Sequence, residues 1–209
     1  MLNKKKGFTL AELLIVIAII GVLVGIAIPV LNSQLEKSRK AKDLHTARSI
    51  ESVLATAVND GTIELAPPTV AGQASGIWVI VTRDKNSWPS GYPDNAKAHN
   101  TYFCGANTTV RINGKENGKD WDVYNDEIEK IVSEAGLIGD GLKVVSKNKN
   151  NDSWDWYGVE VYYHNGDIKT KIFSGNKDKS SDVTKVEEAY NNIGKMIGSL
   201  WNIYNILVL

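Results

Sequence analysis

This sequence has almost no cysteine and no net charge. Its 209 residues contain one cysteine, Cys104, which excludes an intramolecular disulfide and a metal site built from four cysteines. The 24 basic side chains balance 24 acidic ones, and the longest basic run is Lys4 to Lys6. We therefore predict no nucleic-acid partner. Any folded domain must be held together by packing and hydrogen bonds, without a disulfide.

Recognisable catalytic motifs are absent as well. The sequence has no P-loop, nucleophile elbow or HExxH motif, and its three histidines are isolated from one another. Five polar residues crowd together but lack the spacing and central glycine of a calcium loop: Asp120, Asp122, Asn125, Asp126 and Glu127. We interpret this cluster as the solvated start of a helix. The sequence predicts a protein that is not an enzyme and needs no metal or cofactor.

One long segment near the amino end carries no charge at all. Residues 13–35 would extend about 35 Å as an α-helix, which is enough to cross a bilayer. A secretory signal peptide is one alternative, but its apolar region is usually about 7 to 15 residues long. A simple membrane anchor is another. Basic residues lie on both sides of the segment, so their distribution does not settle its orientation.

Neither alternative explains Glu12, a carboxylate at the start of the apolar segment. A charged group in or near lipid costs free energy unless it has a partner. A cut after Gly7 would create a positively charged amino group on Phe8, four residues before Glu12. Between two stacked copies, the carboxylate of one could neutralise the amine of the next, which would favour one register of assembly.

The residues around Gly7 match a known pattern. Residues 4–12, KKKGFTLAE, resemble the class III leader and cleavage site of type IV prepilins, and the resemblance extends to about residue 35. It implies that a prepilin peptidase cuts after Gly7 and methylates Phe8, and that Glu12 acts in assembly. It also implies a filament of pilin subunits, assembled by an inner-membrane platform. The lack of a second cysteine departs from the disulfide-closed loop that such proteins commonly have.

Gly21, Gly25 and Pro29 lie within the apolar segment. The two glycines form a small-xxx-small pair that lets helices approach closely in lipid, while proline removes one backbone hydrogen bond. We expect a weak point between residues 21 and 29 that could stretch without loss of subunit contacts. The alternative is that these residues have no mechanical role, because glycine and proline are frequent in membrane helices.

An amphipathic pattern follows the apolar segment and ends at Asp60 and Gly61. We predict one continuous helix over about residues 8–60, whose second half packs on a globular head through Leu44, Ala47, Ile50, Val53, Leu54, Ala57 and Val58. Lys40 and Asp43 are expected largely off that apolar face. The predicted organisation is a removed leader at 1–7, an apolar helix at 8–35, an amphipathic half at 36–60 and a head at 61–209.

The head has the pattern of an α+β domain: the long helix packed on an antiparallel sheet, with additional short helices. Strands are expected at 76–82, 102–103, 108–113, 142–146, 157–163 and 168–173, the last two forming a hairpin around residues 164–167. Short helices are expected at 123–136 and from Asp182 onward. The uncharged tail at 196–209 is interpreted as core, with a last strand at 205–209 or a subunit-facing surface as alternatives.

Six tryptophans raise the question of a binding surface. Trp88, Trp154 and Trp156 are candidates for exposure and could contact a glycan or a receptor, although packing in the core is the favoured interpretation. The loop at 86–100 is rich in turn residues and is expected to be exposed and mobile. Cys104 is expected to be a small buried apolar residue.

These patterns favour a structural subunit of a type IV pilus that acts in adhesion, motility or aggregation. We expect a single-pass membrane protein before assembly and a cell-surface pilus afterwards. Two alternatives remain open: a pseudopilin of a type II secretion or competence system, and a minor pilin or adhesin that binds glycans. The head, long for a pseudopilin, argues against the first alternative.

Overall fold

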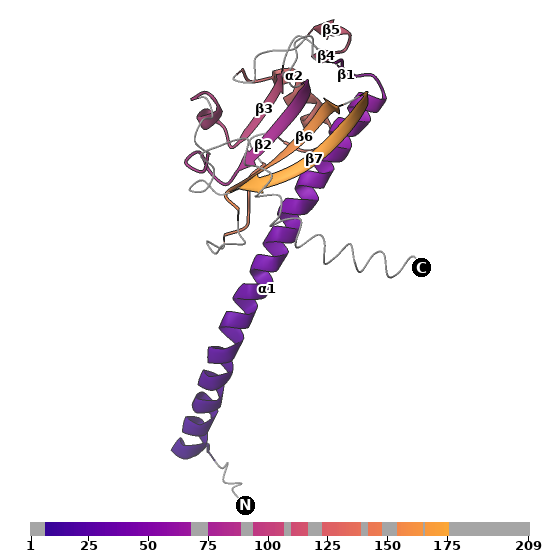
Figure 1. The fold of residues 1–209 in the computed structure, drawn as a ribbon. Helices are drawn as coiled ribbons and strands as arrows, with labels where there is room; N and C mark the ends of the chain where they lie inside the picture. Colours follow the sequence, from indigo (N-terminus) through magenta and orange to yellow (C-terminus); the bar gives the residue numbers. More distant parts are fainter. Residues whose placement is uncertain are drawn as a thin grey trace, which may run out of the picture.

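The computed structural model describes residues 7–67, 75–88, 94–106, 110–116, 123–138, 142–147, 154–164 and 166–175. The predicted helix after Asp182, the uncharged tail at 196–209, and Asp120 and Asp122 lie outside the described residues. The fold is a long helix with a head on its second half (Figure 1). It confirms the predicted α+β architecture, in which the amino-terminal helix packs on antiparallel sheet.

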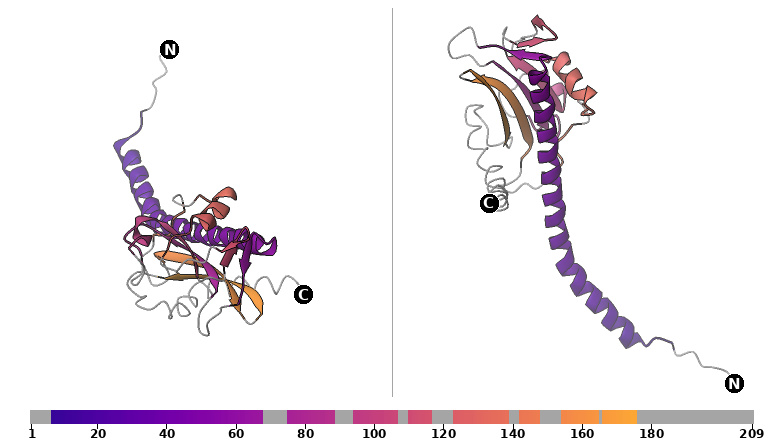
Figure 2. Two further views of the ribbon diagram at one scale, coloured as in Figure 1. Left: turned by 90° about the horizontal axis from the view of Figure 1, so that it is seen from above. Right: turned by 90° about the vertical axis from the view of Figure 1, so that its right-hand side faces the viewer.

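Helix α1 spans Leu10–Asn59, close to the predicted 8–60. Asp60 caps its carboxyl end, and Gly61 follows with φ +80°, a backbone conformation that glycine adopts without strain. Its amino-terminal half projects away from the head and curves (Figure 2). Pro29 lies within this half, where its ring and missing N–H weaken the helical hydrogen-bond ladder.

The main sheet of the head has four antiparallel strands. They are β2 (Gly76–Thr82), β3 (Thr101–Ala106), β6 (Trp156–His164) and β7 (Asp167–Gly175), in the order β3-β2-β6-β7. The hairpin predicted at 164–167 joins β6 to β7, with Gly166 at φ +95°. Short apolar runs such as residues 76–82, bounded by turn residues, were therefore a reliable signal for these strands.

A second, small sheet contains β1 (Ile63–Leu65), β4 (Val110–Ile112) and β5 (Lys115–Glu116), in the order β1-β4-β5. Strands β1 and β5 were not predicted, because two or three residues are too short to show a period of two. The strand predicted at 142–146 is wrong. Residues 142–147 form an irregular segment instead, and its backbone groups bond to the ends of β2 and β3 and to side chains of α1.

The apolar stripe of α1 packs on the inner face of the main sheet. Ala47, Ile50, Leu54 and Ala57 are buried against inward residues of β2, β3 and β6, which include Ile77, Val79, Val81, Phe103, Tyr157, Val159 and Val161. Helix α2 (Asp126–Glu134) adds Ile128 and Val132 to the same core, and the Asn125 side chain caps it. This helix confirms the one predicted at 123–136, within two or three residues at each end.

The outer face of the main sheet has its own aromatic cluster. It consists of Ile80, Trp88, Ala96, Tyr102, Cys104, Trp156 and Phe173. Trp88, Trp154 and Trp156 are 4%, 7% and 2% exposed, so the idea that they form a surface is wrong, and core packing is confirmed. The loop predicted to be exposed at 86–100 is also in part a packing element, because Trp88 and Ala96 close this cluster. Cys104 is buried as expected.

Candidate functional site

The amino-terminal half of α1 is an apolar rod that the head does not cover. Every residue from Gly7 to Leu35 is exposed, including large side chains such as Phe8, Leu13 and Ile26. A helix that is apolar on all sides is suited to lipid or to contact with other helices. Among the described residues, α1 is the one helix that is long and apolar enough to cross a membrane.

Thr9 and Glu12 form the start of this rod. The Glu12 carboxylate accepts hydrogen bonds from the backbone N–H and the hydroxyl of Thr9, both at 2.8 Å, and Thr9 Oγ1 accepts one from the Glu12 N–H at 3.3 Å. This reciprocal arrangement is a capping box, which satisfies N–H groups that a helix start leaves unpaired. Thr9 was not among the predicted site residues, although the T-x-x-E spacing before an apolar run signals this cap.

Gly7 and Phe8 precede the cap in extended chain outside the helix. Phe8 is 85% exposed, and no heavy atom lies within 4 Å of the position that a Cβ of Gly7 would take. A peptide bond between such residues is open to another protein, because neither side chain nor backbone is packed. Leader removal and methylation at these two residues stay predictions.

Gly21 and Gly25 lie one turn apart on α1, and the space over both is open. An apolar helix can therefore approach this strip closely, as the small-xxx-small spacing requires. Pro29 follows one turn later. The structure places all three residues on the uncovered rod, and their roles in assembly or extension stay predictions.

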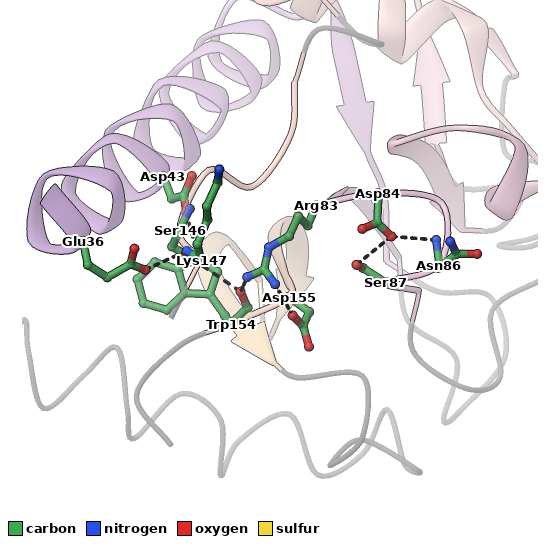
Figure 3. A network of polar contacts seen from close by, with 10 residues as sticks. All are labelled: Glu36, Asp43, Arg83, Asp84, Asn86, Ser87, Ser146, Lys147, Trp154 and Asp155. Carbon is green, nitrogen blue, oxygen red and sulfur yellow. Dashed lines mark hydrogen bonds and ion pairs between the residues drawn. The ribbon is translucent and has the colours of Figure 1, made fainter. Parts of the chain in front are cut away.

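The second half of α1 is attached to the head by a buried carboxylate. Asp43 is 2% exposed and accepts hydrogen bonds from the N–H groups of Val145 (2.8 Å) and Ser146 (3.1 Å) and from Trp154 Nε1 (3.1 Å). Figure 3 shows Asp43 together with Ser146 and Trp154. Burial raises the pKa of Asp43 above its usual value, and these hydrogen bonds oppose the rise. The three donors together replace the water that a carboxylate loses on burial.

Neighbouring polar contacts extend this attachment by two turns toward the apolar rod. Glu36 accepts a hydrogen bond from the Lys147 N–H at 2.7 Å (Figure 3). Glu36 also pairs with Arg39 at 3.3 Å. Lys40 Nζ lies 5.7 Å from the centre of the Trp154 ring, within the range of a cation–π contact. We call Glu36, Asp43, the backbone of residues 145–147 and Trp154 the Asp43 network.

The Asp43 network corrects our expectation for the polar side of α1. Lys40 and Asp43 are 5% and 2% exposed, although periodicity placed them largely away from the core. Residues 142–147 cover them, and this segment is held in turn by the sheet: Val144 N–H bonds to Thr82 O at 3.1 Å and Thr101 Oγ1 to Leu142 O at 3.0 Å. Partners more than 100 residues away leave no local sequence signal.

An exposed apolar helix joined to an antiparallel head is the architecture of the type IV pilin fold, and the sequence comparisons agree with it. Residues 2–28 match the family model described as the prokaryotic N-terminal methylation motif. The chain therefore carries the type IV prepilin motif.

Similar proteins give more specific information than this motif, because the similarity extends over most of the chain. A fimbrial protein of Dichelobacter nodosus is 28% identical over 156 residues, covering 70% of this chain and 94% of that protein. A type IV major fimbrial protein FimA of the same organism is 29% identical over 164 residues, with the same coverage. Another fimbrial protein is 39% identical over 88 residues, 42% of this chain and 52% of its own length. This chain is similar to type IV fimbrial proteins over nearly their whole length. No solved structure gave a significant match.

Proposed function

We propose that this chain is a structural subunit of a type IV pilus, processed after Gly7 and assembled through its apolar amino-terminal helix. The observation that carries this proposal is the apolar rod from Phe8 to Leu35, which the head leaves uncovered on all sides. Such a surface is stable in water only when other molecules cover it. Lipid covers it before assembly, and the helices of neighbouring subunits cover it in the filament.

Removal of the leader prepares the rod for assembly. A prepilin peptidase cuts after Gly7 and methylates the new amino group of Phe8, and an inner-membrane platform then adds the subunit to the filament. The methylation motif at residues 2–28 and the open chain around Gly7 support this step. The subunit is a single-pass membrane protein before assembly and part of a cell-surface fibre afterwards. Its role is structural, and adhesion, motility or aggregation are functions of the fibre.

Glu12 changes its partner during assembly. In the uncut chain, the carboxylate is already satisfied by Thr9 in the capping box. We expect it to turn to the Phe8 amine of a neighbouring subunit, because a charged pair removed from water is more strongly attractive than a hydrogen bond to neutral groups. The capping box thus keeps the carboxylate paired until a neighbour arrives.

Electron microscopy of cells labelled with an antibody to the head tests the filament role. Label along long surface fibres is the expected result. Label that never appears outside the envelope would instead favour a pseudopilin, and label only at fibre tips would favour a minor pilin. The FimA relatives, which are described as major fimbrial proteins, favour the first outcome. Burial of Trp88, Trp154 and Trp156 removes the observation that suggested a glycan-binding adhesin.

A further inference from the structure

A group of exposed lysines lies near the point of α1 where the apolar rod meets the head. Lys37 and Lys42 follow the uncharged residues 13–35 on the helix itself. Lys143 and Lys147 are exposed residues of the irregular segment that lies against the helix. We call these four lysines the basic collar.

The Asp43 network brings the two halves of the basic collar together. The Lys147 N–H lies 2.7 Å from Glu36 Oε1, directly beyond the last residue of the uncharged rod, and Asp43 holds Val145 and Ser146. Lysines more than 100 residues apart in sequence are therefore brought to the same two turns of the helix, between Glu36 and Asp43. At about 1.5 Å per residue, Lys42 is only about 10 Å beyond Leu35.

The acidic side chains of this region are engaged inside the molecule. Asp43 is buried under three N–H donors, Glu36 accepts from Lys147 and pairs with Arg39, and Asp155 pairs with Arg83 at 2.7 Å (Figure 3). These three carboxylates are thus paired within the protein, whereas the lysines of the basic collar are exposed. Among the residues that the structure describes here, the exposed charge next to the rod is therefore mainly cationic, although the whole chain has no net charge.

We propose that the basic collar binds the anionic phospholipid head groups at the membrane surface from which the head emerges. This inference rests on the proposed membrane anchoring of the rod. If residues 13–35 span the bilayer, the basic collar lies within about one Debye length of the head groups, about 8 to 10 Å at physiological salt. Each lysine held at an anionic surface strengthens binding about fivefold. Anionic lipid then retains and orients the subunit before assembly, and this contact is lost when the subunit leaves the membrane.

The test uses the full-length chain in vesicles with spin-labelled lipids. Electron spin resonance gives the selectivity of the protein for phosphatidylglycerol over phosphatidylcholine in its lipid shell. The variant Lys143→Gln with Lys147→Gln should lower this selectivity several-fold at low salt, and by at most about 25-fold, because two lysines that each contribute about fivefold are lost. In 1 M salt, where the Debye length is about 3 Å, variant and wild type should agree.

Lys115→Gln with Lys130→Gln is the matched control, because both lysines are exposed but lie on β5 and α2. This control should keep the wild-type selectivity at low salt. Asp43→Asn should shift the selectivity toward that of the Lys143/Lys147 variant, since it loosens the segment that carries those lysines. The inference is wrong if the Lys143/Lys147 variant keeps wild-type selectivity, or if the control loses as much. A chain that immobilises no lipid at all would instead contradict the proposed membrane anchoring.

Discussion

Asp43 is a buried carboxylate that fixes the position of residues 142–147 against helix α1. It is covered by residues 142–147, and its three N–H donors come from Val145, Ser146 and Trp154. Removing one partner of a buried charged interaction is costly because the other groups stay buried without partners. Asp43 therefore contributes to stability mainly by satisfying the groups that surround it.

We expect Asp43→Asn to lower the free energy of unfolding by about 2 to 4 kcal/mol. The amide nitrogen of asparagine would face an N–H donor where the carboxylate offered an acceptor. Chemical denaturation of the full chain in detergent, followed by tryptophan fluorescence, measures the change. Glu51→Gln is the control, because Glu51 makes its contact to Thr170 at the surface, and its loss should cost less than about 1 kcal/mol. Equal effects of the two substitutions would contradict a special role for Asp43.

The same residue predicts a dependence on pH. Burial raises the pKa of Asp43, so the folded chain keeps a proton that the unfolded chain loses above about pH 3.9. The contribution of Asp43 to the free energy of unfolding therefore falls as the pH rises from the pKa of this carboxyl in the unfolded chain to its higher pKa in the folded chain. Nearby Tyr157 does not interfere, because burial raises its pKa too and it stays protonated. The stability difference between wild type and Asp43→Asn should shrink over this pH range, and denaturation curves at several pH values will show whether it does.

Thr9 and Glu12 allow the two roles of the carboxylate to be separated. Glu12→Ala removes both the capping box and the proposed charge pair, so we expect normal cleavage but few filaments. Thr9→Ala removes only the side-chain part of the cap, and filament yield should fall much less. Yields of sheared filaments, compared by immunoblot with total subunit, provide the measurement. If Glu12→Ala assembled as well as wild type, the pairing with the Phe8 amine would be ruled out.

At the scale of elements, strands β6 and β7 pack together through two aromatic rings, each of which lies over a glycine of the other strand. A Cβ at Gly158 would meet the Phe173 ring and Ile80 Cδ1, and a Cβ at Gly175 would meet the Trp156 ring. These glycines leave room for the Trp156 and Phe173 rings against the neighbouring strand, where the two rings meet edge to face in the outer aromatic cluster. The outer face of the sheet therefore depends on the absence of two side chains.

Gly158→Ala tests this packing. We expect it to lower the free energy of unfolding by about 1 to 3 kcal/mol, because the added methyl group forces Phe173 and Ile80 to move in a filled core. Gly105→Ala on β3 is the matched control, since a Cβ there would lie 3.4 Å from the flexible end of Ile128. Thermal unfolding of the full chain in detergent, followed by near-ultraviolet circular dichroism, compares the two. A control that is destabilised as much as Gly158→Ala would point to a general cost of alanine in these strands.

At the scale of the whole molecule, the two halves of α1 have different surroundings: the first half is exposed and the second half packs on the head. Residues 7–35 are exposed, and from Glu36 onward the helix is held to the described part of the head by the Asp43 network and then by the apolar stripe. The first part can exchange lipid for neighbouring helices while the second part keeps the head in place. Release of the leader is the step that should control this exchange.

Gly7→Ala should block that step. We expect a precursor about seven residues longer than the mature subunit, which stays in the membrane fraction because the Phe8 amine is never formed. Mass spectrometry of the purified chain distinguishes the two forms. Gly21→Ala, which also adds one methyl group but lies far from the cleavage site, should be processed normally. Complete cleavage of the Gly7→Ala chain would contradict the leader assignment.

The sequence predicted those features of the fold that depend on neighbouring residues, and it did not predict contacts between residues that are distant in sequence. The apolar rod, the stripe at Ala47 to Ala57 and strands such as β2 and β6 are visible in the apolar pattern of a few neighbouring residues, so they were predicted correctly. Residues 142–147 look like a strand because they are apolar at alternate positions. They pair instead with side chains of α1, and only the folded chain shows that Asp43 faces them. Among site residues, Thr9 was readable from its spacing, whereas the Asp43 network was not.

Because the Asp43 network consists of hydrogen bonds, formation of this head does not require oxidising conditions. Its irregular segment is held to the helix by hydrogen bonds to a carboxylate, and Cys104 is buried with its pKa raised to about 12 by burial. Neither feature needs an oxidant or a disulfide isomerase. A head closed in this way should fold equally well in the presence of a thiol reductant, so maturation of the subunit is independent of the thiol chemistry of its compartment.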